Sequence, residues 1–561
     1  MEPRVWVKSI TFSDGTSILF ERNDVVIIVG PNNCGKSESL RGIIAKVDHP
    51  IRSNVVVTSV VTDKEGSADE LIQWLASKTR KVDQPFGNHQ FAGLGATIDI
   101  NSARLYWGNP GLGGLTRFFC HLLSAEERLV GASPAGNIAL ATQAPSHPIH
   151  FLQRDDRLEE KLSKQFRRAF GLDLVVHRNA GNVVPLHVGE KPTLKAGQDR
   201  VSLEYVTELE KLPPILNQGD GMRSFAGVLL YAALGSETVL LIDEPEAFLH
   251  PPQARLLGQT LVLDRQSNRQ LFVATHSGDV LRGILDSNSP NVRVIRLRRS
   301  GEVNVTRELN ATEVTEVWSD PLLRYSNILD GLFHEKVVVC ESDADCRFYA
   351  AIMDALFEAK NDGRRKPDIM FTHCGGKARL ALVIRALRKL EVPTAVVTDF
   401  DVLSEEHPLR DIVQAAGGDW DGVSKTWEQV KNAVNAKKPE LSADGVKKEV
   451  TAILEKSEGS AFPSVAAREI QAILRRSSPW ATAKSVGAAY VPNGGPSQAC
   501  ERLLSTLRTW GIFVVPGGEL ESFCKTAGGH GPAWVNAVIG KNLKNDPEFD
   551  VARKFVSIVI G

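Results

Sequence analysis

The chain has 561 residues, with 66 Lys and Arg against 67 Asp and Glu, and 42% of its residues are hydrophobic. This length predicts two to four domains, and this composition excludes an intrinsically disordered chain. The apolar runs are far shorter than the roughly 20 residues that cross a bilayer, and the first residues lack the apolar core of a secretion signal. Seven scattered cysteines without a C-x-x-C pair indicate a reducing compartment and argue against a zinc ribbon. We therefore expect a cytoplasmic protein without membrane contact.

In chain order, the N-terminal half begins with a predicted hairpin, residues 5–12 and 17–21 around a turn. Three fully apolar segments, at 25–29, 239–242 and 271–274, are typical of the buried strands of an α/β sheet. A charged helix is expected at 154–170 and a second hairpin at 293–305. Residues 312–333 indicate a linking helix and loop.

The C-terminal half shows a second α/β pattern. Apolar strands are predicted at 337–339, 394–397 and 512–515, and a helix at 345–358. Residues 405–508 have a mostly helical pattern, which predicts a helical insertion. We therefore expect an α/β protein with one domain over residues 1–330 and a second over 331–561. The first domain would contain an inserted helical or dimerisation region at about 120–210.

The strongest motif directly follows the strand at 25–29. Residues 30–37, Gly-Pro-Asn-Asn-Cys-Gly-Lys-Ser, fit the P-loop pattern G-x-x-x-x-G-K-[ST]. Such a loop holds the phosphates of ATP with backbone N–H groups at a helix N-terminus. Lys36 would reach the β- and γ-phosphates, and the Ser37 hydroxyl would bind Mg²⁺. The nucleotide-binding residues of this loop are Gly30, Asn32, Asn33, Gly35, Lys36 and Ser37.

A second acidic motif supplies the partner of the P-loop. Asp243 ends the apolar strand at 239–242, where it would hold Mg²⁺ through water, and Glu244 could polarise the water that attacks ATP. The Gly219-Asp220-Gly221 segment lies upstream, before an apolar helix. His276 lies downstream, just after the strand at 271–274.

The order of these motifs resembles the ABC ATPase superfamily. The resemblance implies a head-to-tail homodimer, or a higher homo-oligomer, with ATP between the P-loop of one subunit and the Gly219–Gly221 signature of the other. His276 would be the switch histidine. Asp220 departs from the usual signature and places a carboxylate near the expected γ-phosphate. Three glutamines are candidates for the Q-loop: Gln73, Gln84 and Gln90.

Acidic residues also follow two strands of the C-terminal half. Glu341 and Asp345 follow the strand at 337–339, and Asp399-Phe400-Asp401 follows the strand at 394–397. Carboxylate oxygens suit Mg²⁺ or Mn²⁺, and two such ions can hold the attacking and leaving oxygens of a phosphodiester. Positive charge for a DNA backbone would come from nearby basic residues: Arg364, Arg365, Lys366, Lys377, Arg379, Arg385, Arg388 and Lys389.

This acid set resembles the Toprim domain. An ABC ATPase followed by a Toprim domain resembles the OLD (overcoming lysogenization defect) family of nucleases. The resemblance implies that Glu519 and Glu521 add metal ligands, and that Lys525 or Lys541 contacts the scissile phosphate. Because the family includes the Gabija ATPase–nuclease and retron effectors, it also implies a role in bacterial defence against phage, with a partner protein or nucleic acid.

The function that these motifs favour is an ATP-hydrolysing, metal-dependent endonuclease that acts on double-stranded DNA. Glu244 would be catalytic in the ATPase, and Glu341, Asp399 and Asp401 in the nuclease. One alternative is a Toprim topoisomerase or primase. The six tyrosines do not lie in an evident DNA-cleavage module, and the missing zinc ribbon argues against a primase. The other alternative is an ATP-gated DNA clamp, against which the complete acid set and the missing long coiled coil argue.

Overall fold

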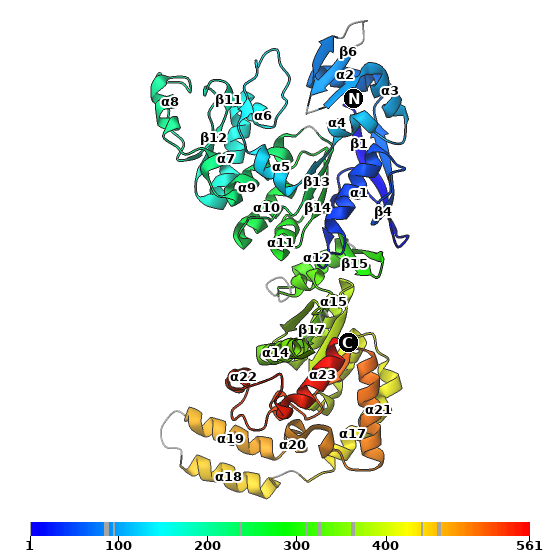
Figure 1. Cartoon of the computed structure of the whole chain (residues 1–561). Helices are drawn as coiled ribbons and strands as arrows, with labels where there is room; N and C mark the ends of the chain where they lie inside the picture. The colour runs from blue at the N-terminus through cyan, green and yellow to red at the C-terminus, as the bar shows by residue number, and fades with distance from the viewer. Residues whose placement is uncertain are drawn as a thin grey trace. The chain divides into compact units, whose positions relative to one another are not determined.

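The computed structural model describes residues 2–83, 89–93, 96–235, 237–309, 311–321, 327–360, 365–438, 441–456 and 462–561. The chain forms two compact units, Met1–Asp320 and Pro321–Gly561 (Figure 1). Each unit is built on a mainly parallel sheet with helices, so the predicted α/β class is confirmed. None of the helices in the described ranges is long and apolar enough to cross a bilayer.

The main sheet of the first unit has six strands in the order β16-β15-β3-β14-β13-β8. All but β16 run parallel, and β16 pairs antiparallel to β15. The strands are β3 (Val25–Val29), β8 (Cys120–Leu123), β13 (Val239–Asp243), β14 (Gln270–Ala274), β15 (Val292–Ser300) and β16 (Val303–Leu309). Because parallel strands end at one edge, the residues that follow β3, β13 and β14 gather there.

A smaller antiparallel sheet joins the same core. It consists of β1 (Arg4–Phe12), β2 (Ser17–Leu19) and β4 (Val57–Glu65) in the order β2-β1-β4. The predicted hairpin is confirmed as the β1–β2 pair. Apolar side chains of both sheets pack with helix α1 (Lys36–Asp48) in one cluster that includes Val7, Val26 and Leu40. Helices α2 (Ala68–Lys78) and α3 (Ile100–Gly108) and the sheet β5 (Arg80–Asp83), β6 (His89–Gly93) and β7 (Ala96–Asp99) continue this unit.

The segment expected as a helical insertion at about 120–210 differs in two ways. It begins with β8, which is an edge strand of the core sheet. It also contains four short strands, β9 (Ala135–Gly136), β10 (Asp173–Val176), β11 (Val183–Val184) and β12 (Leu186–Gly189), beside helices α5 (Ala125–Gly131), α6 (Ile149–Arg154), α7 (Asp156–Phe170) and α8 (Leu203–Glu210). Strands of two to four residues give too little alternation to be detected in a sequence.

The second unit has a four-stranded parallel sheet in the order β18-β17-β19-β20. Its strands are β17 (Lys336–Cys340), β18 (Ile369–His373), β19 (Thr394–Thr398) and β20 (Ile512–Val514). Helices α14 (Asp343–Lys360), α22 (Pro532–Ile539) and α23 (Asp550–Ile560) pack around an aromatic core that includes Phe348, Phe523 and Trp534. Helix α15 (Leu380–Lys389) packs against β17 and β19.

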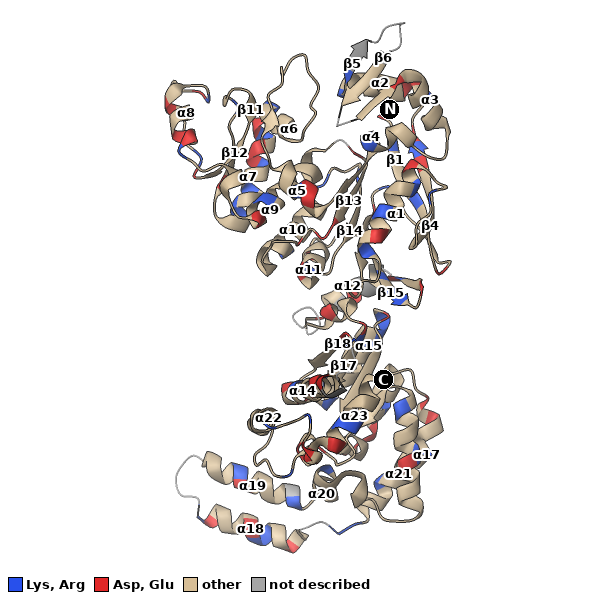
Figure 2. Cartoon of the chain, viewed as in Figure 1, with Lys and Arg blue, Asp and Glu red and all other residues tan. Residues whose placement is uncertain are grey.

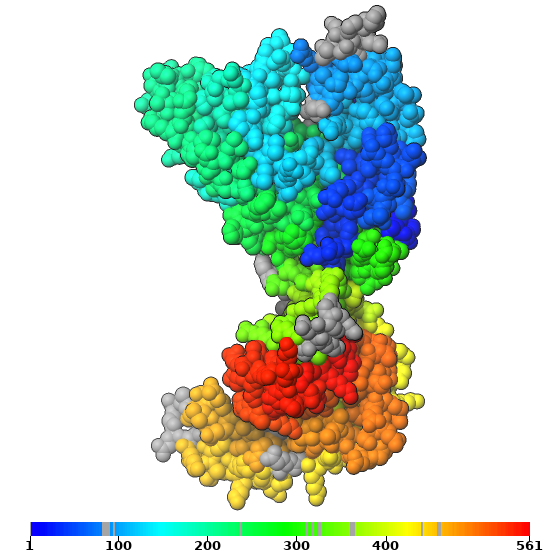
Figure 3. Space-filling view, in the orientation of Figure 1, coloured from blue at the N-terminus to red at the C-terminus, as the bar shows by residue number. Residues whose placement is uncertain are grey.

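Residues 405–508 connect β19 to its neighbour β20, and the elements that they form in the described ranges are helices joined by short turns. The helices are α16 (Glu406–Ala415), α17 (Trp420–Asn435), α18 (Ala443–Glu455), α19 (Ser464–Arg476), α20 (Pro479–Val486) and α21 (Gly495–Thr509). The Trp427 indole donates a hydrogen bond of 2.9 Å to the Leu403 carbonyl, which fixes α17 to the end of the sheet. This segment, yellow to orange in Figure 3, forms much of the visible surface of the second unit.

Candidate ATP and metal sites

The P-loop is held in place by its own lysine and by a neighbouring strand. Lys36 Nζ donates to the carbonyl oxygens of Gly30 and Pro31 at 2.8 and 2.9 Å. Gly30 has a φ of 149°, and a Cβ at this position would lie 2.2 Å from the Leu297 carbonyl oxygen. The Asn304 side chain on β16 donates to the Cys34 carbonyl. The β15–β16 hairpin therefore fixes the loop from outside.

The acids that follow β13 face the end of the P-loop. The Ser37 hydroxyl donates to Asp243 Oδ1 at 2.9 Å. The Glu244 N–H donates to the Ala274 carbonyl at 2.8 Å, and the residue has a φ of 48°. His276 Nδ1 lies 3.4 Å from Glu244 Oε1 and 3.1 Å from Glu246 Oε1. The structure thus brings together Ser37, Asp243, Glu244 and His276, as a Mg²⁺–ATP site requires.

Two charged residues at this edge were missed by the sequence analysis. Glu246 is buried, and its Oε1 accepts from the Thr275 hydroxyl and the His276 N–H, both at 2.8 Å. Burial raises the pKa of Glu246. Arg128, fully buried on α5, donates to the Asp243 carbonyl. Burial lowers the pKa of Arg128, and the charges of Glu246 and Asp243 act in the opposite direction. Arg128 lies on α5, the helix after β8, and no sequence motif indicates that β8 pairs with β13.

The predicted contacts of Gly219 and Gly221 are with ATP bound to a second subunit, so a single chain does not test them. Gly219 and Gly221 lie at the start of α9 (Asp220–Leu234), where Asp220 pairs with Arg223 at 2.9 Å. Their proposed contact with a partner's ATP stays a prediction. Gln73 lies in α2 and Gln90 in β6, both outside the six-stranded sheet, and Gln84 lies outside the described residues. None of the three glutamines therefore lies in the segment after β8, from which Arg128 reaches the Asp243 carbonyl.

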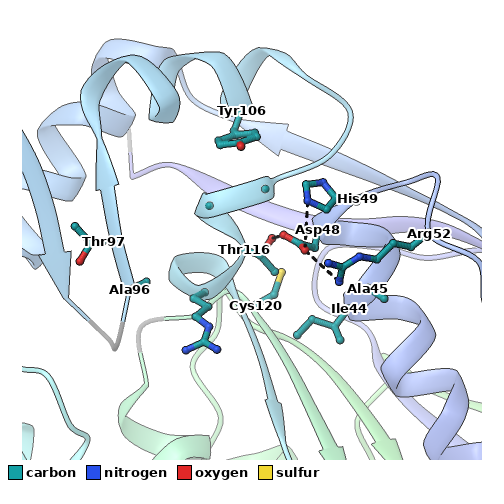
Figure 4. Close-up of a pocket in the computed structure, with 13 residues that line it drawn as sticks. Ile44, Ala45, Asp48, His49, Arg52, Ala96, Thr97, Tyr106, Thr116 and Cys120 are labelled. Carbon is teal, nitrogen blue, oxygen red and sulfur yellow. Dashed lines mark hydrogen bonds and ion pairs between the residues drawn. The ribbon is translucent and has the colours of Figure 1, made fainter.

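A cavity of about 600 Å³ lies at the other end of α1 (Figure 4). Its lining includes Asp48, His49, Arg52 and Tyr106. Asp48 already pairs with His49 at 3.8 Å and with Arg52 at 3.5 Å. Because α1 begins at Lys36 and ends at Asp48, the cavity is separated from the P-loop by the length of the helix, about 20 Å. It does not belong to the ATP site.

In the second unit, three predicted acids meet at the carboxyl edge of the sheet. Glu341 follows β17, and its Oε1 accepts from the Thr398 hydroxyl at 2.6 Å and the Asp399 N–H at 3.0 Å. Glu341, Asp399 and Asp401 each offer an oxygen atom, and these atoms lie within 4.8 Å of one another. We call them the first acid group. Such a set can hold a divalent ion.

Asp345 lies near this group, but its carboxylate accepts hydrogen bonds from Ser342. Its Oδ2 accepts from the Ser342 N–H at 2.8 Å and from the Ser342 hydroxyl at 2.9 Å. Burial raises the pKa of Asp345, and the charges of Glu341 and Glu521 act in the same direction. Asp345 thus closes the start of α14, and its role as a metal ligand stays a prediction.

Two lysines contact the first acid group. Lys484 Nζ lies 2.7 Å from Asp399 Oδ2 and 3.5 Å from Asp401 Oδ1. Lys377 Nζ lies 3.6 Å from Asp401 Oδ2 and 3.3 Å from Glu405. Lys484 lies on α20, within the helical insertion, and was missed because nothing in the sequence indicates where the insertion folds back. Of the two lysines expected near the phosphate, Lys541 instead pairs with Glu548 at 3.5 Å.

Glu519 and Glu521 form a second group together with His530, which the sequence analysis also missed. One ligand atom of each residue lies within 4.8 Å of the others. Glu521 Oε1 lies 2.9 Å from His530 Nδ1 and accepts from the Gly531 N–H at 2.8 Å. We call this set the second group. Burial and the charge of Glu521 raise the pKa of Glu519, whereas the charges of His530 and Lys484 act to lower it. The two groups therefore adjoin each other around Lys484.

One carboxyl of the first acid group has a pKa close to neutral pH. Burial and the neighbouring Glu341 raise the pKa of Asp399 to about 8, against the opposing charge of Lys484. Burial alone would lower the pKa of Lys484, but Asp399 and Asp401 outweigh burial and raise it. A site of this kind gains a strong preference for an added cation.

Two protein-family models match parts of the chain. The family described as "AAA domain, putative AbiEii toxin, Type IV TA system" matches residues 138–282, which include Asp243, Glu244 and His276 but not the P-loop. The family described as "Overcoming lysogenization defect protein-like, TOPRIM domain" matches residues 332–401. The second match includes Glu341, Asp399 and Asp401. It ends before the second group.

The chain also resembles two curated proteins. It is 25% identical to the Old nuclease of Escherichia phage P2 over 176 residues, which cover 30% of this chain and 28% of the nuclease. It is 33% identical to the uncharacterized protein MJECL11 of Methanocaldococcus jannaschii over 88 residues, 15% of this chain and 77% of that protein. A crystal structure of the SmcHead bound to the C-winged helix domain of ScpA aligns with 56% of this chain and 100% of that chain at 11% identity, and its TM-score of 0.34 is too low to support an inference.

The raised pKa of Asp399 predicts that metal binding to the second unit depends on pH. Below a pKa of about 8 this carboxyl holds a proton, which a metal ion must displace. We expect the apparent affinity for Mn²⁺ to rise about five-fold between pH 7 and pH 8 in the nucleotide-free protein. The Asp399→Asn variant should bind more weakly with little change over this range. Titration followed by the Mn²⁺ EPR signal measures both, and equal wild-type affinity at the two pH values would contradict the prediction.

Proposed function

We propose that this chain, which belongs to the OLD family of ATPases with a C-terminal Toprim domain, is an ATP-hydrolysing, divalent-metal-dependent DNA endonuclease. The observation that carries the proposal is the first acid group: Glu341, Asp399 and Asp401 meet at one sheet edge with a lysine ammonium 2.7 Å from Asp399. Carboxylates and a cation at one point suit a phosphodiester and its metal ions. The Old nuclease supports the same activity by resemblance.

In the nuclease, each group of side chains has a separate task. Glu341, Asp399 and Asp401 would hold one ion, and Glu519 and Glu521 would hold another, with Mg²⁺ as the expected metal and Mn²⁺ as the substitute. The ions would polarise the phosphodiester and activate water. Lys484 can donate three hydrogen bonds from a flexible stem, so we assign it to the non-bridging phosphate oxygens.

In the ATPase, the P-loop would bind the phosphates through Gly30, Asn32, Asn33, Gly35 and Lys36. Ser37 and Asp243, joined by a hydrogen bond of 2.9 Å, would hold the Mg²⁺. Glu244 would orient the attacking water, and His276, 3.4 Å from it, would hold that carboxylate in place. The signature at Gly219 and Gly221 would complete the site of a second subunit, so the active ATPase would be a homodimer or a higher homo-oligomer.

Double-stranded DNA is the substrate that we propose, and exposed basic residues of the second unit would contact its backbone. On α15, Arg385, Arg388 and Lys389 lie on the exposed face. Other expected contacts are already engaged within the chain: Arg365 pairs with Glu335, and Lys366 pairs with Asp354. Arg364 lies outside the described residues. Figure 2 shows Lys and Arg interspersed with Asp and Glu along the helices and strands of both units, so the DNA contact would be local.

A role in defence against phage, with a partner protein or nucleic acid, is the biological setting that the family resemblance supports.

The alternatives are less well supported. A topoisomerase needs an accessible tyrosine nucleophile. Tyr349 is only 2% exposed behind the acid group, and Tyr490 stacks with the Lys437 ammonium at 4.2 Å. A non-cleaving DNA clamp would not need the acid group.

The first prediction of this proposal separates the two activities. Glu341→Ala and Asp399→Ala should each lower Mg²⁺-dependent cleavage of supercoiled and linear DNA by about 10²–10³-fold or more, because each removes charge that holds the metal. ATP hydrolysis should persist, because those residues lie in a different unit from the P-loop. Asp354→Asn, an exposed acid on α14, is the matched control. Wild-type cleavage by Asp399→Ala would contradict the Toprim site.

The second prediction concerns ATP. Lys36→Ala should lose ATP binding and hydrolysis, because the ammonium contacts the phosphates directly. Glu244→Gln should bind ATP but hydrolyse it about 10²-fold or more slowly, since it keeps the shape and loses the charge that orients water. Equilibrium binding of a fluorescent ATP analogue and phosphate release measure the two properties. An equal loss of ATP binding in both variants would show that Glu244 does not act on water.

The third prediction concerns control of the nuclease by nucleotide. ATP can bridge two ATPase sites, and a ligand shifts such an equilibrium by its different affinity for the two states. Residues 312–333 would transmit the change, because they lead from the ATPase sheet to β17. We expect DNA cleavage by Glu244→Gln to differ between saturating ATP, ADP and no nucleotide at constant free Mg²⁺. Equal rates in all three, with binding confirmed, would mean that the activities are independent.

A further inference from the structure

The turn that follows β13 carries a buried carboxyl group to which the proposed function gives no role. Glu246 lies two residues after Glu244, and its Oε1 accepts from the Thr275 hydroxyl and the His276 N–H, both at 2.8 Å. His276 Nδ1 lies 3.1 Å from the same oxygen. We propose that Glu246 is a positioning residue of the ATPase, which orients the His276 imidazole toward Glu244. This inference rests on the proposed function and adds to it a residue that acts through another side chain.

The backbone of this turn has an unfavourable conformation and needs an anchor. Glu244 and Phe248 have φ values of 48° and 72°, which residues with a side chain rarely adopt. Such backbone persists only where the surrounding structure holds it. Glu246 lies between these two positions, and its side chain ties the turn to Thr275 at the end of β14. The Thr275 N–H donates to the Ile28 carbonyl at 3.1 Å, so the turn is joined to β3, the strand that leads into the P-loop.

Burial makes Glu246 the fixed member of this group of side chains. The side chains of His276 and Glu244 are 47% and 43% exposed, whereas that of Glu246 is 6% exposed. An exposed side chain keeps its choice of rotamers, but a buried carboxylate with two hydrogen bonds does not. The charge of fully buried Arg128 acts on Glu246 and balances it within the protein. The imidazole therefore takes its orientation from Glu246.

The carboxylate also affects which ring nitrogen of His276 carries a hydrogen atom. Both acids face Nδ1, at 3.1 Å for Glu246 and 3.4 Å for Glu244. A negative charge at this distance favours a hydrogen atom on Nδ1, as the partner of one ring nitrogen generally determines the state of the other. Nε2 is thereby left for the bound nucleotide or for the water that attacks it.

The simpler alternative is that Glu246 only holds the turn through the two hydrogen bonds of its Oε1. A neutral side chain with one acceptor oxygen would do the same. The second oxygen of Glu246, Oε2, is buried and has no hydrogen-bond partner in the described parts of the chain. An unsatisfied buried oxygen costs stability. Support of the turn alone therefore does not account for an acid at this position, whereas a charge that faces the imidazole does.

The Glu246→Gln variant separates the two roles in the full chain. Its amide oxygen can still accept from Thr275 and from the His276 N–H, while the charge that faces the imidazole is lost. We expect kcat for ATP hydrolysis to fall about tenfold to a hundredfold. The dissociation constant for ATP should stay within about twofold of the wild-type value. Glu237→Gln is the matched control with wild-type kcat, because Glu237 is also buried but pairs with Arg269 before the start of β13.

A double-mutant cycle shows whether Glu246 acts through the imidazole. His276→Ala should lower kcat at least as far as Glu246→Gln does. The double variant should be no slower than His276→Ala, because the acid then has no ring to orient. Phosphate release at saturating ATP gives kcat, a fluorescent ATP analogue gives the dissociation constant, and circular dichroism shows that each variant is folded.

Four results would overturn the role of Glu246. These are a wild-type kcat in Glu246→Gln, an equal loss in Glu237→Gln, losses that multiply in the double variant, and a Glu246→Gln chain that does not fold. The last two would assign Glu246 to support of the turn. All four leave the proposed ATPase intact. Absence of Lys36-dependent hydrolysis in the wild type would instead refute the ATPase together with this role.

Discussion

Repulsion between carboxylates gathered at the carboxyl edges of parallel strands is the constraint on which both sites depend. A parallel sheet brings the ends of its strands together, and here acids follow the strands β13, β17 and β19. Burial and like charges at such short range raise the pKa of a carboxyl, as burial and Glu341 do for Asp399. The fold can keep these acids together only by supplying cations of its own or by leaving places for bound ones.

The two units meet this constraint with different cations. In the first unit, buried Arg128 caps the Asp243 carbonyl and acts on the acids around it, and His276 lies between Glu244 and Glu246. In the second unit, Lys484 and Lys377 contact the first acid group. A buried arginine cannot leave, so it is a permanent part of the ATP edge. A flexible lysine can exchange places with a metal ion or a phosphate, as the proposed nuclease would require.

Much of this arrangement could be predicted from the sequence, because strand ends carry local signals. The strands at 25–29, 239–243 and 394–398 are mainly apolar, and each leads directly into the P-loop or into acids, so the edges on which these residues meet were predictable. Arg128, Lys484 and His530 were not predictable. Each comes from a segment whose own pattern indicates only a helix or a loop, and its position depends on long-range packing: α5 against α9, α20 against the turn after β19.

The helical insertion is part of the proposed metal site, because it supplies Lys484. The chain leaves the sheet after Asp401 and returns at β20, beside β19, just before Glu519. The Phe400 N–H donates to the Gly518 carbonyl at 2.7 Å, which joins the point of departure to the point of return. Lys484 lies near the end of the insertion and is packed against the same turn, where a Cβ on Gly518 would lie 2.0 Å from the Lys484 carbonyl. The insertion therefore places its lysine between two acid motifs that are 118 residues apart, Asp401 and Glu519.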